Sequence, residues 1–491
     1  MHDGPKSGRV ANNHGSAKEH PTVVEQKLMK EVGLGRVAGP FCKQPLQDLV
    51  ISPIGLVEKS TPGEFRLIFD LSYPSGQSVN DGIPPQLSSV VYTPFDAVTD
   101  MVQKLGSGAH LIKVDIQSAF RLLPLHPQDF NLTGMQHKGL YFVDKALPFG
   151  CSISCALFEK FSTFLEWCAK LVSGSNNIIH YLDDFCGCSR TWEEASQLLS
   201  AILGLFNSFG VPVAQEKVEG PVTCIKFLGL EVDTIAMEVR LPADKVSDLL
   251  NCIITVQGRE KITLRELQSL IGKLNFACRA VVPGRAFSRR LVDATCGVRK
   301  PHHRIRVTGN MREDLLVWQE FLENFNGRSI MLGKWIDCDQ LELYTDAAAS
   351  IGFGAYFQGK WALGTWPDHW NTQGPDITFK ELFPIVLALQ LWAEQFSNKR
   401  VLFFCDNQAV VQIINRQSTR SPPSMRLIRL LVLTCLQNNI ACKAKHIPGC
   451  TNNIADALSR GQLTRFRALA PGAESEPTQI PNTLLQQLQQ R

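Results

Sequence analysis

The sequence predicts an α+β protein built of several domains. Its length of 491 residues exceeds the size at which a single hydrophobic core keeps growing. Short β-like runs alternate with helical patterns in the first half, and the same alternation returns after a mainly helical stretch. An apolar share of 44 % and a charged share of 20 % are typical of a folded chain and exclude wholesale disorder.

The first domain is expected at residues 41–240. The preceding residues 1–40 are polar and show little periodicity, which predicts a flexible N-terminal arm. Within 41–240, β-like runs and helical spacing of apolar residues mark the elements. The expected strands are 65–69, 111–114 and 178–182, and the expected helices are 153–172 and 193–209.

Residues 241–335 are mainly helical and basic. From Arg259 to Arg306 there are twelve Lys or Arg residues against three acids. Because apolar residues recur there at helical spacing, the stretch predicts helices with a basic outer face. Such a face is either a solvated surface or a track for a polyanion backbone. The candidates for a track are Arg265, Lys273, Arg279, Arg285, Arg289 and Arg290.

Residues 336–465 predict a compact mixed-sheet unit of β-β-β-α-β-α-β-α order. Residues 466–491 follow it, rich in Pro, Ala and Gln, and are expected to form a flexible C-terminal tail. The expected strands are 341–345, two within 352–366, 401–405 and 441–446. The expected helices are 378–396, 408–415, 425–438 and 453–459. The short helix 408–415 and the neighbouring helix 425–438 count as one element in this order.

Cysteine spacing and hydropathy limit the setting of the protein. The fifteen cysteines include no C-x-x-C pair, so reduced thiols are expected rather than a structural zinc site. The polar first residues and the lack of a long apolar run predict neither a signal peptide nor a membrane span. We therefore expect a cytoplasmic or nuclear protein that is not secreted and has no membrane partner.

A first group of carboxylates lies in the 41–240 domain. NIIHYLDDFCGCS predicts a hairpin with Asp183 and Asp184 at its tip, and Asp115 ends the apolar strand HLIKVD. The repulsion among these acids is offset if divalent cations bind, because Mg²⁺ prefers carboxylate oxygens. Two ions about 4 Å apart would activate a primer 3′-hydroxyl and stabilise a pyrophosphate leaving group. The alternative is an ordinary Asp-Asp turn.

The surrounding motifs resemble those of retroelement reverse transcriptases. VDIQSAF at 114–120, LPFG at 147–150, YLDD at 181–184 and FLG at 227–229 match in order and spacing. The resemblance implies an RNA-directed DNA polymerase with a right-hand arrangement of palm and fingers (41–240), followed by a thumb and helical connection (241–335). It further implies that Asp115 and Asp183 bind Mg²⁺ or Mn²⁺, two ions per active site, with Asp184 as the third acid.

The same resemblance assigns roles to four further side chains. Lys59 and Arg66 would hold the incoming triphosphate, a task that needs cations facing phosphate oxygens; the alternative is two surface cations on a hairpin. Phe120 would act as a steric gate that favours deoxynucleotides. Lys217 fits the lysine that protonates the leaving pyrophosphate.

Two motifs concern the primer and the nucleotide pocket. Phe227, Leu228 and Gly229 would form the hairpin that grips the primer end. In LPFG, Phe149 and Gly150 would line the substrate site. Retroviral enzymes carry Gln where this chain has Phe149, whereas Phe is common in retrotransposon enzymes, so this departure is compatible with activity.

A second group of carboxylates lies in residues 336–465. Asp346 and Asp406 end apolar strands, and Glu381 and Asp456 sit on helices that would pack over the sheet. The four acids can meet at one sheet edge, where metal would offset their repulsion. Their order resembles ribonuclease H, which implies two Mg²⁺ ions that activate water to cut the RNA of a hybrid. His446 fits that family's mobile histidine, or else is a strand-end histidine satisfied by the backbone.

Shorter cues look most like DIRS-type retrotransposons, with gypsy-type elements next. They are PFCKQPLQDLVISPIGLVEK, CALFEKFSTFLEWC and HIPGCTNNIADALSR. The sequence contains no aspartic-protease, integrase-finger or CCHC motif. A DIRS-type element would therefore depend on a separately encoded tyrosine recombinase as partner.

The sequence thus predicts a retrotransposon polymerase that copies RNA into DNA and a ribonuclease H that degrades the RNA strand. The expected partners are an RNA template, a DNA primer, the RNA–DNA hybrid and deoxynucleoside triphosphates. The alternatives are a domesticated or decayed copy that binds nucleic acid without catalysis, and an enzyme with one live site. All seven metal-ligand acids are intact, which argues against decay.

Overall fold

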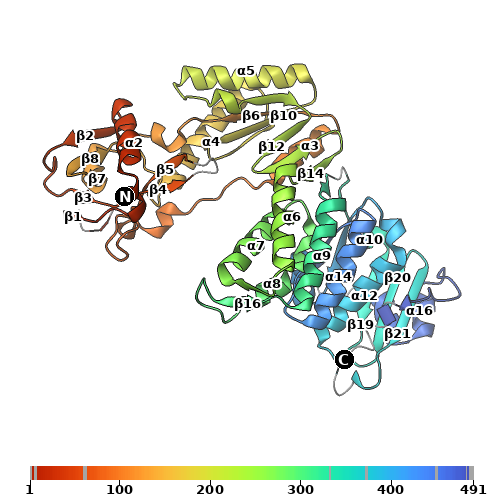
Figure 1. Ribbon diagram of the computed structural model, residues 1–491. Coiled ribbons are helices and arrows are strands. Elements are labelled where there is room, and N and C mark those ends of the chain that lie inside the picture. The colour runs from red at the N-terminus through yellow and green to blue at the C-terminus, as the bar shows by residue number, and fades with distance from the viewer. Residues whose placement is uncertain are drawn as a thin grey trace. The chain divides into compact units, whose positions relative to one another are not determined.

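The computed structural model describes residues 3–4, 8–58, 63–330, 333–370, 374–447, 452–482 and 484–485. The contacts divide the chain into unit 1, Met1–Phe227, and unit 2, Leu228–Arg491 (Figure 1). The sequence pattern places the first boundary at residue 240 instead. The difference arises because the short hairpin of β13 (Leu230–Asp233) and β14 (Glu238–Arg240) belongs to unit 2.

A four-stranded antiparallel sheet is the centre of unit 1. Its strand order is β11-β6-β10-β9, and α4 and α5 pack against it (Figure 1). Buried apolar side chains such as Ile112, Phe158 and Phe185 fill the space between the sheet and the helices. The strands are β6 (His110–Asp115), β9 (Ile178–Tyr181), β10 (Asp184–Ser189) and β11 (Glu219–Val222), and the helices are α4 (Ser154–Ser173) and α5 (Trp192–Ser208).

These elements match the strands and helices expected from periodicity. Helix α5 begins where Thr191 accepts a hydrogen bond from the Glu194 backbone, and acids occupy its first turn. The helix-like QSAF segment is a short 3₁₀ helix, η3 (Ala119–Leu122), entered through a left-handed Ser118. The other short elements of this region are α3 (Asp96–Leu105), η1 (Asn80–Gly82), η2 (Pro85–Ser88), η5 (Gln215–Lys217) and β12 (Cys224–Phe227).

The expectation of a flexible arm over residues 1–40 is wrong for residues 15–40, which the structure describes as ordered elements. Helix α2 (Pro21–Gly33) buries Val24 and Leu28 completely, and these lie one helical turn apart. Val23 and Val32 pack against the same core, so the helix carries an apolar stripe that the polar composition of the whole segment outweighed in the prediction. The rest of this region comprises β1 (Arg9–Val10), α1 (Gly15–Glu19), β2 (Val37–Phe41), β3 (Val50–Ile51), β4 (Ile54–Glu58), β5 (Phe65–Phe69), η4 (Pro127–Leu132), β7 (Gly134–His137) and β8 (Leu140–Asp144).

The first part of unit 2 is helical, as expected. Its core holds the fully buried Trp318, and a Cβ at Gly284 would lie 2.2 Å from that indole ring, so only glycine fits there. Helix α7 starts with a capping box between Thr263 and Glu266. The elements are α6 (Ala243–Gln257), β15 (Lys261–Thr263), α7 (Leu264–Ala277), η6 (Val282–Phe287), α8 (Arg289–Asp293), β16 (Arg304–Arg306), α9 (Gly309–Asn324) and β17 (Arg328–Ser329).

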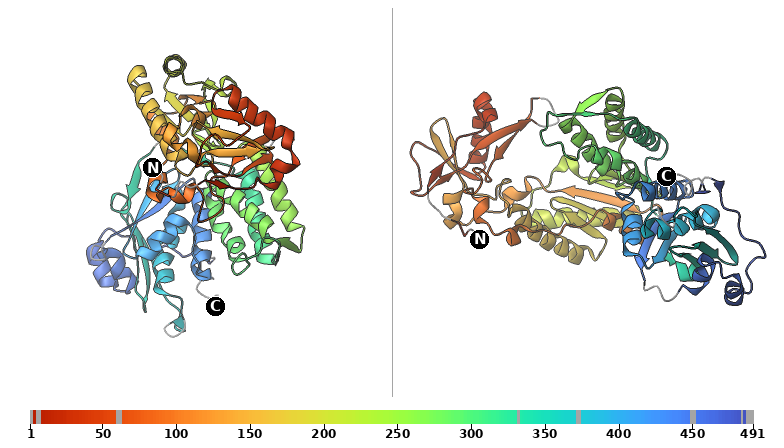
Figure 2. Two further views of the ribbon diagram at one scale, coloured as in Figure 1. Left: turned by 90° about the vertical axis from the view of Figure 1, so that its left-hand side faces the viewer. Right: turned by 90° about the horizontal axis from the view of Figure 1, so that it is seen from below.

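The second part of unit 2 follows the expected β-β-β-α-β-α-β-α order. It forms an antiparallel sheet β19-β20-β21 and a parallel sheet β18-β22-β23, and Figure 2 shows this region in blue from two further sides. The strands are β18 (Trp335–Asp337), β19 (Leu343–Ala347), β20 (Gly352–Phe357), β21 (Lys360–Thr365), β22 (Arg400–Cys405) and β23 (Ala441–His446). The helices are α10 (Cys338–Leu341), α12 (Ile377–Trp392), η7 (Ala393–Phe396), α13 (Gln408–Arg416), α14 (Pro422–Gln437), α15 (Asn453–Ser459) and α16 (Leu463–Leu469).

The expected flexible tail at 466–491 is wrong for its described first part. Phe466 of α16 is fully buried. The Trp361 indole N–H donates to the Glu474 carbonyl at 2.7 Å, and the Arg467 guanidinium donates to backbone carbonyls of residues 473–475. Composition suggested mobility, but the contact with Trp361 of β21 and the hydrogen bonds from Arg467 hold the segment in place.

No helix within the described ranges is long and apolar enough to cross a bilayer.

A buried ion pair joins the two parts of unit 2. Arg429 of α14 donates to both carboxylate oxygens of Asp314 on α9, at 2.8 and 3.0 Å, and its guanidinium lies over the Phe287 ring. Arg290 approaches the same carboxylate at 3.2 Å. Burial raises the pKa of Asp314 to about 6, although both arginines oppose that rise.

We expect Arg429→Ala to destabilise unit 2 more at pH 7.5 than at pH 5. The folded pKa of Asp314 lies above its usual value of about 4, so at pH 5 the folded carboxyl is mostly protonated and needs no cation. At pH 7.5 the variant leaves a buried carboxylate with Arg290 alone, at a cost of about 2 kcal/mol. Urea unfolding at the two pH values measures the difference. Arg259→Ala, which breaks an exposed pair with Glu266, should cost under about 1 kcal/mol, and an equal loss for Arg429→Ala at both pH values would contradict the prediction.

Candidate active sites

Strand pairing brings the three acids of unit 1 together. In the antiparallel β6–β10 ladder, Asp184 lies directly opposite Asp115. Asp183 occupies the turn after Leu182, whose φ is 52°, and the Ile116 N–H donates to the Asp183 carbonyl at 3.0 Å. The structure therefore confirms a hairpin tip next to a strand end.

The electrostatics of this site show an excess of negative charge. Burial, followed by the charges of Asp183 and Asp115, raises the pKa of Asp184 to about 7. Burial also raises the pKa of Asp183. Lys217 Nζ lies 2.9 Å from Asp115 Oδ2, and this hydrogen bond raises the pKa of the lysine. Lys217 thus faces three carboxylates, and Lys113, which pairs with Glu219, also lowers the pKa of Asp184. The three carboxylates are a donor set suited to a hard divalent cation.

The carboxylates do not form a ready-made metal cage. Within the part of the chain that the structure describes, no three His, Cys, Asp or Glu side chains are close enough together to hold one metal ion. Asp115 points its Oδ2 at Lys217, so part of the charge compensation comes from that ammonium. The sequence resemblance placed Lys217 at a leaving group instead.

The LPFG segment is locked against strand β5. A Cβ at Gly150 would lie 1.8 Å from the Phe69 carbonyl oxygen, and Asn80 Nδ2 donates to the Gly150 carbonyl at 2.9 Å. Phe149 is 63 % exposed. Its ring centroid lies 5.0 Å from that of Phe120, so the two aromatic residues that the sequence selected are neighbours.

Arg66 and Phe227 differ in exposure. Lys59 lies outside the described residues. Arg66 is exposed on β5, opposite Val57 of β4. Phe227 is buried and ends unit 1.

The last two residues of the FLG motif, Leu228 and Gly229, lie in unit 2. Lys245, which the sequence did not indicate, contacts Gly229. Leu228 and Gly229 both have positive φ, 46° and 78°. Lys245 Nζ donates to the Gly229 carbonyl at 2.9 Å and lies over the Phe276 ring. A Cβ at Gly229 would lie 2.3 Å from that Nζ. No local pattern links residues 229 and 245.

A buried histidine behind the YLDD hairpin was also missed. His180 of β9 is 4 % exposed, its Nδ1 contacts Glu166, and its Nε2 lies 3.3 Å from Glu159 Oε1. Both glutamates are on α4, so the cluster connects the hairpin to the helix beneath it. A histidine at the end of an apolar strand, directly before YLDD, was the available signal.

The second site lies in unit 2, in a pocket that contains three of the four predicted acids. Asp346, Glu381 and Asp406 line it. Burial, then the charges of Asp346 and Asp406, raises the pKa of Glu381 to about 8. Burial also raises the pKa of Asp346, against the effect of a 2.6 Å hydrogen bond from the Ser459 hydroxyl.

Asp456 and His446 each contact other protein groups. Asp456 pairs with Arg460 at 2.6 Å and Arg465 at 2.7 Å; despite the opposing effect of burial, these arginines lower its pKa. His446 Nε2 lies 3.1 Å from the Asp406 backbone carbonyl. This is the backbone contact that the strand-end alternative describes.

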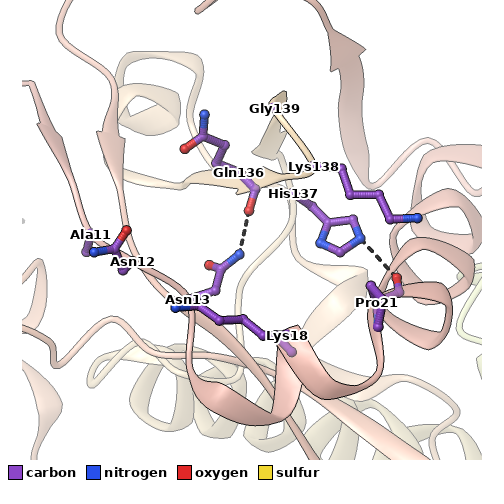
Figure 3. Close-up of a pocket in the computed structure, with 10 residues that line it drawn as sticks. Ala11, Asn12, Asn13, Lys18, Pro21, Gln136, His137, Lys138 and Gly139 are labelled. Atoms are coloured by element: carbon purple, nitrogen blue, oxygen red, sulfur yellow. Dashed lines mark hydrogen bonds between the residues drawn. The ribbon is translucent and has the colours of Figure 1, made fainter.

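The pocket in Figure 3 is lined by other residues than the two carboxylate groups. It contains none of the predicted site residues. Asn13 Nδ2 donates to the Gln136 carbonyl at 2.7 Å, and His137 Nε2 donates to the Pro21 carbonyl at 2.9 Å. Burial lowers the pKa of His137. Among the described residues that line it there is no acid, so this pocket lacks the carboxylate oxygens that a hard divalent cation prefers.

One protein family matches the region of the chain that contains the first site. The family described as "Reverse transcriptase (RNA-dependent DNA polymerase)" matches residues 59–232, a range that includes Asp115, Asp183 and Asp184. The chain therefore contains a reverse transcriptase domain.

Individual relatives are distant viral proteins. Protein P of heron hepatitis B virus is 24 % identical over 294 residues, 59 % of this chain and 35 % of that protein. The Gag-Pro-Pol polyprotein of human T-cell leukemia virus 2 is 25 % identical over 285 residues, 56 % of this chain and 18 % of that protein. The chain thus matches about a third or less of the length of these relatives.

Solved structures support the fold. A foamy viral protease-reverse transcriptase in complex with RNA/DNA hybrid superimposes with a TM-score of 0.55 at 17 % identity, over 90 % of this chain and 55 % of that one. At this identity the likeness concerns the fold alone. The α+β multidomain fold with palm, fingers, thumb and a further domain is confirmed.

We expect Gly150→Ala to destabilise unit 1 by more than about 3 kcal/mol, because the new methyl group would overlap the Phe69 carbonyl. Gly204→Ala is the matched control. Gly204 lies in α5, and a methyl group added there would meet no atom within 4 Å, so alanine should stabilise the helix by about 0.5–1 kcal/mol. Thermal or urea unfolding measures both; similar changes for the two variants would contradict the expected close packing at Gly150.

Proposed function

We propose that this chain is an RNA-directed DNA polymerase. The observation that carries the proposal is the β6–β10 register, which sets Asp184 opposite Asp115 with Asp183 at the adjoining turn, inside the reverse transcriptase domain. Three carboxylates close together in partial burial, which raises the pKa of Asp183 and Asp184, are costly for the fold and are explained by binding of cations.

Each residue of the site then has a chemical task. Asp115, Asp183 and Asp184 would hold Mg²⁺ or Mn²⁺, two ions in the proposal. When bound, the ions supply Lewis acidity for nucleotidyl transfer from a deoxynucleoside triphosphate. Lys217 pairs with Asp115 and would be available as a proton donor at the site. Phe120, packed against Phe149, would form the aromatic wall against a ribose 2′-hydroxyl.

We propose a second activity, ribonuclease H, for unit 2. The specific observation is the pocket that gathers Asp346, Glu381 and Asp406 at the ends of strands and on a helix. The raised pKa of Glu381, about 8, indicates carboxylates that a divalent cation would stabilise in the ionised form. Asp456, now paired with two arginines, would complete the set.

The proposed partners are an RNA template, a DNA primer and their hybrid. A foamy viral relative in fold was solved with an RNA/DNA hybrid, which supports this class of ligand. A DIRS-type or gypsy-type retrotransposon origin, a tyrosine recombinase partner and a cytoplasmic or nuclear location belong to the proposal on the sequence cues alone. A chain that binds the hybrid without catalysis is the competing function.

Primer extension on a poly(rA)/oligo(dT) template with Mg²⁺ tests both activities when labelled RNA is followed in the same tubes. Asp183→Asn should abolish extension and leave RNA cleavage, because it removes a carboxylate from the first site alone. Asp406→Asn should abolish cleavage and leave extension. If the unchanged chain retains hybrid in EDTA but neither extends nor cleaves in Mg²⁺, the binding function replaces the catalytic one.

Mg²⁺ should also stabilise the protein measurably. A ligand at about 100 times its Kd raises the free energy of unfolding by about 2.7 kcal/mol. We expect Mg²⁺ to raise the Tm of the unchanged chain and of Asp129→Asn, a carboxylate outside both sites. The rise should shrink in Asp183→Asn/Asp184→Asn, and an undiminished rise in that variant would argue against metal binding by these acids.

A further inference from the structure

A two-stranded ribbon in unit 2 has one apolar face and one cationic face. In the antiparallel pairing of β15 with β16, Ile262 faces Ile305, and both are buried. Directly opposite residues of a pair share a face. The other face therefore carries Lys261, Arg304 and Arg306, all of which are exposed.

Like charges meet on this cationic face. Lys261 is the direct cross-strand partner of Arg306, and two cations in that relation destabilise a ribbon. The loop before β16 adds Arg299 and Lys300, both exposed. The run RKPHHRIR from 299 to 306 holds four Lys or Arg residues, two His residues and no acid.

The ribbon cations differ from the basic residues that the sequence had suggested as a track. Lys273 is paired with Asp248 at 2.7 Å, and Arg289 with Asp293 at 2.5 Å. Arg290 contacts Glu313 and Asp314, and Arg279 lies over the Phe276 ring. Four of the six candidates thus have a protein partner.

No such partner compensates the ribbon. Among the described residues, none supplies a carboxylate within 4 Å of Lys261, Arg304 or Arg306. The nearby Glu266 already accepts from the backbone and hydroxyl of Thr263 and pairs with Arg259. Within the described part of the chain this cationic face is therefore left without a carboxylate partner, and an external anion would offset its cost.

We infer that this face binds the phosphate backbone of the RNA–DNA hybrid, at a site distinct from both carboxylate groups. The inference rests on the proposed function, which supplies a polyanion as ligand. Arg304 and Arg306 stand two residues apart on one face of a strand, about 7 Å along it. Guanidinium groups in a row suit successive phosphates, because each forms charge-assisted hydrogen bonds without base specificity.

The test is the salt dependence of hybrid binding. Fluorescence anisotropy with a labelled RNA–DNA hybrid in EDTA separates binding from turnover. The slope of log binding constant against log salt concentration is negative, and Arg304→Ala/Arg306→Ala should make it shallower by about 1.8, since each lost phosphate contact removes about 0.9. Between 50 and 200 mM salt, the unchanged chain should then lose about tenfold more affinity than the variant.

A control of equal charge loss isolates the ribbon. Arg259→Ala/Lys399→Ala removes two exposed cations of unit 2, of which Arg259 is paired with Glu266 and Lys399 donates to a backbone carbonyl. This control should keep the slope of the unchanged chain. If the first ribbon variant unfolds, Lys261→Ala/Lys300→Ala is the second ribbon variant. It leaves the sequence of β16 unchanged.

Each outcome has a separate meaning. An unchanged slope in a folded ribbon variant, or an equal loss in the control, overturns the ribbon site while the proposed function stands. If the ribbon variant loses affinity for phosphatidylserine vesicles but keeps its hybrid affinity, the face binds a membrane and the inference is wrong. If the unchanged chain does not bind the hybrid at all, the proposed function itself fails.

Discussion

The pairing of β6 with β10 is the constraint on which the first site depends. The ladder runs without a shift from Ser189 opposite His110 to Asp184 opposite Asp115. A slip by one residue would move one of these carboxylates to the other face of the sheet and bury its charge in the core. The apolar residues of the ladder prevent such a slip, since Ile112 and Phe185 pack into the interior. Packing of the core therefore fixes the position of the acids.

Both candidate sites place more negative charge in partial burial than the protein itself neutralises. The pKa values of Asp184 and Glu381, about 7 and 8, have burial as their main cause and neighbouring acids as the next. Lys217 and Arg460 each neutralise one acid of a site. Like charges lie close together at both sites and at the cationic ribbon, which is unfavourable for stability, whereas the surrounding cores are apolar. Such local conflicts are expected at functional surfaces.

The two parts of unit 2 are joined by side chains rather than by a shared sheet. Arg429 reaches from α14 to Asp314 on α9 and to the carbonyl of Ala286. This contact relates the helical region, with its ribbon, to the region that holds the second acidic pocket. A nucleic acid bound along unit 2 would meet surfaces held in a defined relation by that buried pair.

The sequence by itself determined the order of elements and the acids at the strand ends, because periodicity and short motifs are local properties. It also identified Phe120, Phe149 and Gly150 without their contacts. Only the tertiary structure decided how residues 15–41 and 466–478 pack, since the overall composition of these segments is polar and their packing partners are distant in sequence. It likewise decided which cations are paired: Lys217 meets Asp115 across 102 residues of sequence, and no local pattern encodes a contact of that range.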